Sequence, residues 1–314
     1  MAAINFAPVM EPETYNRLHP IRALLVYMFV VFLGGALLAP WLYWATQPFA
    51  AHFGFAMGPF HRFVNRSLLG LALIGIWPLL RNLGANSLRD VGIVKPAGQW
   101  KLLLGGFALG FGSLACVAVI VLAAHGRNLN ADLTAMQVSG NVAGAAATAI
   151  IVAVIEEILF RGAIFGALRK IWDWRLALVV SSMIYAIVHF MQSADLPGHV
   201  TWLSGLKLLP LMLRGFGNWD AIIPAFFSLT LVGILLGLAY QRTGNLYFSI
   251  GLHAGWIFWL RAYGLLTRPV DGDASHPFFG SQKLTDGWLT LCVLAVVLLV
   301  LPFLPLGKPK EVPE

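Results

Sequence analysis

Two adjacent glutamates, Glu156 and Glu157, lie in an apolar stretch of the chain, AIIVAVIEEILFRGAIFG, and Arg161 follows four residues later. Two histidines, His189 and His253, lie in other apolar stretches further along. Carboxylates and imidazoles are common proton carriers in enzymes. Because an ionisable side chain inside a bilayer costs about 2.5–3.5 kcal/mol on insertion scales, one that is retained there usually serves a function. These five residues are therefore the candidates for chemistry.

The spacing of these residues predicts different roles for the two glutamates. Side chains four positions apart share a helix face, so Glu157 and Arg161 are expected to form a supporting ion pair while Glu156 points elsewhere. Glu156 has no partner on its own helix, and the nearest side chains with which it could act are those of His189 and His253 on other helices. A carboxylate can deprotonate a water molecule held against a peptide carbonyl, and a histidine can hydrogen-bond the resulting oxyanion. For either histidine alone, a hydrogen bond between helices is the alternative.

Other catalytic patterns are not evident in the sequence. It contains neither HExxH nor a readable Ser-His-Asp or Cys-His arrangement, and Cys116 and Cys292 fall in apolar stretches that favour neither a disulfide nor a CxxC metal site. Glu156, His189 and His253 could form a zinc site with two His ligands and one Glu ligand. The three residues come from separate segments, so no ligand-pair spacing indicates a metal. We expect no cofactor, with zinc as the alternative that metal analysis would test.

The composition is that of an integral membrane protein. Of the 314 residues, 59% are hydrophobic and 11% are charged, whereas a soluble domain carries about 25% charged residues. Apolar runs of about 20 residues, enough to cross a hydrocarbon core, predict an all-α polytopic protein in which about eight transmembrane helices enclose an intramembrane polar site. Segment 199–219 is predicted to be an interfacial or re-entrant helix. The expected spans are 23–46, 66–81, 101–124, 141–168, 175–193, 221–241, 245–265 and 286–306.

The distribution of charge predicts topology and partners. We expect one membrane domain over residues 1–314, and the excess of Lys and Arg on one side of the spans predicts that both termini are cytoplasmic. The expected location is a bacterial inner (plasma) membrane. The net charge of +7 is dispersed over loops, which favours contact with lipid headgroups and not with nucleic acid. The expected partners are membrane lipids and a membrane-associated protein or peptide substrate.

The depths of the titratable groups also predict one shared site. A helix rises about 1.5 Å per residue, so Glu156 lies roughly 18 Å, His189 roughly 21 Å and His253 roughly 12 Å from the cytoplasmic ends of their helices. All three depths fall within a hydrocarbon core about 30 Å thick. Three separate helices are therefore expected to bring these side chains together.

Three short patterns occur in order along this part of the chain. They are EExxxR at Glu156, Glu157 and Arg161, YxxxH at Tyr185 and His189, and HxxxI at His253 and Ile257. In this order and in their apolar context, residues 139–262 resemble the CPBP family of intramembrane proteases, also called Abi or CAAX-protease-like, whose eukaryotic relatives trim prenylated CAAX proteins. The family patterns are EExxxR, FxxxH and HxxxN, so Tyr185 replaces a Phe and Ile257 replaces an Asn.

The resemblance implies roles for individual residues. Glu156 would activate water, His189 would hold or polarise that water, and His253 would stabilise the oxyanion, with Glu157, Arg161 and Tyr185 in support. The family's Asn would supply another oxyanion donor, which Ile257 cannot. Loss of one such donor costs about 10²–10³ in rate. Either another group, such as Ser249 or Trp256, substitutes for it, or the protein is slow or non-proteolytic.

Several classes of function are thus open. The leading hypothesis is an intramembrane endopeptidase, that is, a CAAX prenyl endopeptidase-like peptidase whose natural substrate the sequence does not identify. The alternative is a non-proteolytic membrane scaffold or a bacteriocin-immunity-type protein of the same fold. A proton-coupled transporter is a weaker third class, because no inverted repeat is evident. Gly233 and Gly237 form a GxxxG pattern, which is expected to pack within the protein, with a dimer contact as the alternative.

Overall fold

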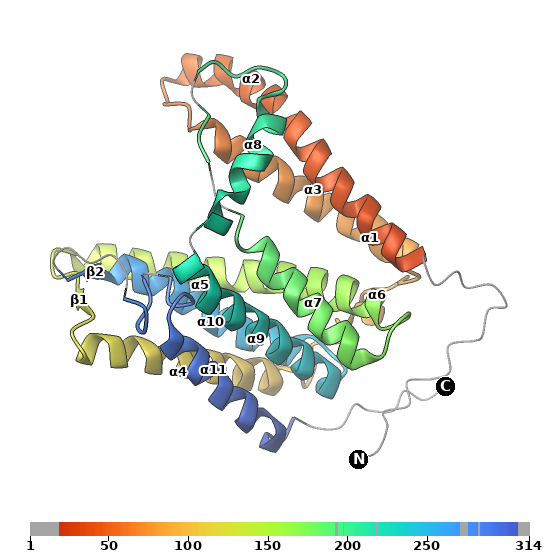
Figure 1. Ribbon diagram of the computed structural model, residues 1–314, viewed down its shortest axis with the longest axis vertical. Coiled ribbons are helices and arrows are strands. Elements are labelled where there is room, and N and C mark those ends of the chain that lie inside the picture. Colours follow the sequence, from red (N-terminus) through yellow and green to blue (C-terminus); the bar gives the residue numbers. More distant parts are fainter. Residues whose placement is uncertain are drawn as a thin grey trace.

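The computed structural model is almost entirely helical (Figure 1). It describes residues 19–306, except 192–193, 197, 218, 271–275 and 282, so the termini predicted to be cytoplasmic lie outside the described residues. The α-helices are α1 (His19–Phe29), α2 (Gly35–Phe53), α3 (Phe60–Asn82), α4 (Trp100–Ala123), α5 (Ala135–Glu157), α6 (Gly166–Leu168), α7 (Trp174–Val188), α8 (Ser204–Met212), α9 (Trp219–Thr243), α10 (Tyr247–Leu266) and α11 (Trp288–Val300). Two π-helices, η1 (Val30–Gly34) and η3 (Ile158–Phe165), and three 3₁₀-helices, η2 (Leu88–Val91), η4 (Leu213–Gly217) and η5 (Leu301–Phe303), complete the helical elements.

Helices occur at all eight expected spans, but they differ in length. Within the described part of the chain, five helical stretches are long and apolar enough to cross a membrane: His19–Phe53, Phe60–Asn82, Trp100–Ala123, Ala135–Leu168 and Ile222–Thr243. Helices α7, α10 and α11 are not among these five. With 15 residues, α7 extends about 22 Å, short of a core about 30 Å thick. An all-α membrane protein is therefore confirmed, whereas the count of eight crossings is not.

Helix α10 lies against both α4 and α5, and small residues permit its close approach to α4. A Cβ atom at Gly106 or Gly110 of α4 would collide with the carbonyl of Phe248 or Leu252 on α10. Glycines of α10 are equally close to the α4 backbone in return, as Gly251 shows. Such contacts between small residues let helix backbones meet. The seam fixes α10, which carries His253, relative to its neighbours.

Helix α9 packs along α7 through the GxxxG pattern. A Cβ atom at Gly233 would lie 2.6 Å from Cβ of Ser182, and one at Gly237 would collide with the side chain of Leu178. Both contacts are internal, so the expected packing within the protein is confirmed. Figure 1 shows α5, α7, α9, α10, α4 and α11 stacked as one bundle.

Helices α1, α2, α3 and α8 form an arm that diverges from this bundle (Figure 1). Near α6 the arm packs on the bundle through a buried cluster that includes Tyr27, Leu80 and Ala163. Helix α8 has nine residues and touches α2, where a Cβ atom at Gly205 would collide with the backbone of Ala36. Segment 199–219 thus contains a short helix, as expected, and its interfacial or re-entrant position stays a prediction.

Two short strands were not expected from the sequence. Strand β1 (Arg127–Leu129) follows α4 and pairs antiparallel with β2 (Thr267–Pro269), which follows α10. Buried Arg127 donates from Nε to the hydroxyl of Thr267 at 2.8 Å. The ladder therefore joins the ends of α4 and α10 and reinforces their glycine seam.

Candidate active site

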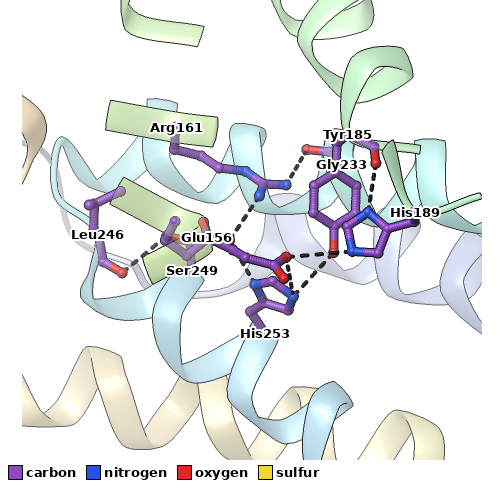
Figure 2. Close-up of polar contacts among 9 residues, drawn as sticks. Glu156, Arg161, Tyr185, His189, Gly233, Leu246, Ser249 and His253 are labelled. Atoms are coloured by element: carbon purple, nitrogen blue, oxygen red, sulfur yellow. Dashed lines mark hydrogen bonds and ion pairs between the residues drawn. The ribbon is translucent and has the colours of Figure 1, made fainter. Parts of the chain in front are cut away.

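The candidate residues lie on four elements that meet in the bundle (Figure 2). Glu156 and Glu157 end α5, and the π-helix η3 that carries Arg161 follows directly. His189 caps the C-terminus of α7, and His253 lies in the middle of α10. The structure therefore brings together the residues that the sequence placed at overlapping depth. Their position within a bilayer stays a prediction.

The inner half of the site, formed by Glu157, Arg161 and Nδ1 of His253, is closed to solvent. The Glu157 side chain is 0% exposed, and its Oε1 accepts a hydrogen bond from Arg161 at 2.9 Å, as the spacing predicts. The same Oε1 lies 2.9 Å from Nδ1 of His253, a contact that the sequence did not predict. Arg161 also donates to the carbonyl of Gly233 on α9 at 3.3 Å. This half therefore ties α5, η3, α9 and α10 together.

The outer half, formed by Glu156, His189 and Nε2 of His253, is open. Oε2 of Glu156 lies 3.6 Å from Nε2 of His189 and 3.7 Å from Nε2 of His253, beyond ordinary hydrogen-bond length. This oxygen has no hydrogen-bond partner among the described residues. The side chains of Glu156 and His189 are 23% and 31% exposed, against 4% for His253. Oε2 itself is buried, so the exposed part of this half is the rest of the Glu156 side chain together with His189.

Tyr185 enters the site more closely than a supporting residue. Its hydroxyl lies 3.2 Å from Nε2 of His253. Its backbone carbonyl accepts a hydrogen bond from Nδ1 of His189 at 2.7 Å, which leaves Nε2 of a neutral His189 as an acceptor directed at Glu156. From the sequence, Tyr185 was predicted only to be a supporting residue that stands where the family pattern has Phe. The signal that could have found it is the added hydroxyl itself, one helical turn before His189.

Position 257, where the family pattern has Asn, is a packing position in this protein. Ile257 is buried against Ala149, Ala153 and Ala254. The two expected substitute donors are engaged elsewhere. Ser249 donates to the carbonyl of Leu246 at 3.0 Å, and the indole N–H of Trp256 donates to the hydroxyl of Ser113 at 2.9 Å. Neither is directed at Glu156.

The described residues contain no group of three or more His, Cys, Asp or Glu side chains whose arrangement could hold a metal ion. Zinc dependence stays a prediction for metal analysis. A cavity of about 430 Å³ lies in the arm, lined by residues such as Tyr43 and Lys207, away from the candidate site. A small apolar pocket of about 20 Å³ adjoins Tyr185 and His253, with room for about one water-sized group.

Comparison with known protein families finds a match in the middle of the chain. Residues 138–259 match the family model Type II CAAX prenyl endopeptidase Rce1-like. The Rce1-like segment runs from α5 to most of α10 and contains every candidate residue, so the resemblance read from the three patterns is confirmed. Helices α1 to α4 and α11 lie outside the Rce1-like match, whereas α8 of the arm lies within it. Comparisons with curated proteins and with solved structures found no match.

Proposed function

We propose that this protein is an intramembrane endopeptidase that hydrolyses peptide bonds of membrane-associated substrates. One observation carries the proposal: within the Rce1-like segment, Oε2 of Glu156 lies between the Nε2 atoms of His189 and His253, at 3.6 and 3.7 Å. The Glu156 side chain is part-exposed, and this oxygen is buried with no hydrogen-bond partner among the described residues. A carboxylate oxygen that has imidazole neighbours but no hydrogen bond of ordinary length is available as a general base.

Glu156 and His189 are suited to hold a water molecule. Nδ1 of His189 donates to the Tyr185 carbonyl, so Nε2 of the neutral ring is an acceptor, as is the Glu156 carboxylate. One water can donate a hydrogen to each, which leaves an oxygen lone pair for a peptide carbonyl carbon. Such positioning of a nucleophile is a large part of catalysis. The water molecule here is a reactant.

The reaction then proceeds in two balanced steps. Glu156 takes a proton from the water as its oxygen bonds to the carbonyl carbon, and the C=O π pair moves onto the oxygen as an oxyanion. His253 stabilises that oxyanion. The oxyanion then returns its pair to carbon, the C–N bond breaks, and protonated Glu156 gives its proton to the leaving amine. Peptide and water become a carboxylic acid and an amine, and Glu156 is restored.

The proposal is tested with purified protein in proteoliposomes. The substrates are a peptide with a farnesylated cysteine in a C-terminal CAAX sequence and the same peptide without the lipid, and cleavage is followed by mass spectrometry. We expect wild type to cleave at least one of them and Glu156→Gln to reduce the rate by about 10²–10⁴, the usual contribution of a general base. Asp132→Asn is the matched control, because it makes the same change at an exposed carboxylate paired with Arg268 at 2.8 Å.

Two outcomes would contradict the proposal. The first is cleavage by Glu156→Gln at the wild-type rate. The second is no cleavage of either peptide by wild type, together with full complementation of a deletion strain by the Glu156→Gln gene, which would favour the non-proteolytic scaffold. Comparative membrane proteomics of wild-type and Glu156→Ala strains would then identify the natural substrate by the protein termini that depend on the glutamate.

A further inference from the structure

The hydroxyl of Tyr185 is a polar group at the reaction centre that the mechanism above leaves unused. The side chain is 3% exposed, and Oη lies 3.2 Å from Nε2 of His253. That same Nε2 lies 3.7 Å from Oε2 of Glu156 (Figure 2). The hydroxyl therefore lies beside the place where the proposed base and the substrate carbonyl meet. A phenyl ring at this position would bring no polar atom there.

The partners of His253 decide which group can donate. Nδ1 faces Oε1 of Glu157, which already accepts from Arg161, so Nδ1 of His253 carries the hydrogen. In the neutral ring Nε2 then holds a lone pair and accepts from the Tyr185 hydroxyl. In the doubly protonated ring Nε2 donates, and the hydroxyl hydrogen is free to turn elsewhere. With doubly protonated His253, both Nε2 and the Tyr185 hydroxyl can donate to an oxyanion. With neutral His253, Nε2 cannot donate, and the hydroxyl can do so by turning its one hydrogen away from Nε2.

The ring of Tyr185 is held on several sides. The Arg161 guanidinium lies 4.9 Å from its centroid, the Phe160 ring packs edge-on at 4.9 Å, and the His189 ring lies at 4.3 Å. Oη therefore has a fixed position, and only rotation about the bond from the ring to Oη redirects its hydrogen. A preorganised donor of this kind stabilises developing charge without reorganisation of its surroundings.

We propose, on the basis of the proposed function, that Tyr185 is a catalytic residue whose hydroxyl donates a hydrogen bond to the oxyanion. It takes the place of the donor that Ile257 cannot supply. The tyrosine keeps its proton throughout: the hydrogen bond strengthens as the π pair moves onto the carbonyl oxygen and weakens as that pair returns to carbon. Two departures from the family patterns, at Tyr185 and Ile257, thus compensate each other.

The first test is Tyr185→Phe, assayed in proteoliposomes with the peptide that wild type cleaves. The ring and its packing are kept and the hydrogen bond to buried His253 is lost, so we expect a folded protein with a lower unfolding midpoint, an unchanged KM and a kcat lower by about 10²–10³. Tyr263→Phe is the control, because Tyr263 is also buried on a helix of the bundle and its hydroxyl has no hydrogen-bond partner among the described residues. We expect it to keep the wild-type kcat. A wild-type kcat for folded Tyr185→Phe would overturn the inference and leave the proposed function standing.

The second test includes a single variant, Ile257→Asn, whose result does not depend on the folding of Tyr185→Phe. Position 257 lies one turn beyond His253 and packs on Ala153, one turn before Glu157, so an amide there is close to the carboxylates. We expect Ile257→Asn alone to change kcat by less than about 10-fold, and Ile257→Asn in the Tyr185→Phe background to recover at least about 10-fold. An increase of about 10²–10³ in the single variant would show that wild type lacks this donor and would overturn the inference. No cleavage of either peptide by wild type, together with full complementation by the Glu156→Gln gene, would contradict the proposed function and this inference with it.

Discussion

Two carboxylates that are adjacent in the chain lie in contrasting surroundings. The inner half of the site buries Glu157 completely and gives one of its oxygens two partners, Arg161 and His253. The outer half leaves the Glu156 side chain part-exposed, with its histidine neighbours beyond hydrogen-bond length. Buried charges in folded proteins are paired, whereas a reactive carboxylate must be free to take a proton. Under the proposed function, the inner half would hold the fold and the outer half would perform the chemistry.

The two halves are joined through His253 and Tyr185. His253 presents Nδ1 to Glu157 and Nε2 to Glu156, and Tyr185 presents its ring to Arg161 and its hydroxyl to His253. A change in the inner half is therefore expected to alter both stability and activity. A change confined to the outer half is expected to alter activity alone. The variants described below distinguish effects on stability from effects on activity.

The largest effect on stability is expected from Arg161→Met. Removing one partner from a buried ion pair leaves an uncompensated charge, which costs about 3–5 kcal/mol. The free energy of unfolding would be measured in detergent mixtures. Arg175→Met is the control, because exposed Arg175 lies over the Trp174 ring at 5.4 Å and has no buried partner in the described structure. We expect a small change there.

The double variant Arg161→Met with Glu157→Leu sharpens this test. It removes both charges together, and apolar replacements of a buried pair are often neutral or better. We expect it to be more stable than Arg161→Met alone, although inactive. If Arg161→Met had the same free energy of unfolding as Arg175→Met, the ion pair of the inner half would not be what stabilises the packing of α5, α9 and α10.

The next largest effects are expected from replacing each of the two histidines with alanine. His189→Ala removes a contact to Glu156 from the outer half only, so we expect cleavage to fall by about 10²–10⁴ with little loss of stability. His253→Ala also removes the Nδ1 donor from buried Glu157, so we expect a similar loss of cleavage and an added destabilisation of about 1–3 kcal/mol. Kinetic assays and unfolding curves on the same samples would check both. If both variants had the same free energy of unfolding, the inner half would contribute no more to stability than the outer half.

Much of this site could be predicted from local sequence pattern. The pairing of Glu157 with Arg161 follows from a spacing of four residues, and the convergence of three helices follows from residue depth along apolar runs. Both inferences need only the regular geometry of a helix. The identity of Glu156 as the free carboxylate followed in the same way, because it has no local partner.

The remaining features depend on contacts between distant segments. The bond from His253 to Glu157 joins residues 96 positions apart, and it depends on how closely α10 approaches its neighbours through the glycine seam. The π-helix η3 has no signature in the apolar period, although such turns occur often at functional sites. The hydroxyl of Tyr185 was read as a mild departure because its distance from His253 depends on the packing of α7 against the other helices.

The smallest effect is expected at Ile257. This side chain packs against Ala149, Ala153 and Ala254 and contributes no polar atom, so Ile257→Val removes one buried methylene and is expected to cost about 0.5–1.5 kcal/mol of unfolding free energy. We expect kcat and KM to stay at wild-type values, measured on the same proteoliposome preparation as Tyr185→Phe. A fall in kcat of about tenfold without loss of stability would mean that the packing of Ile257 helps to orient Glu156. Ile257 would then belong to the outer half of the site.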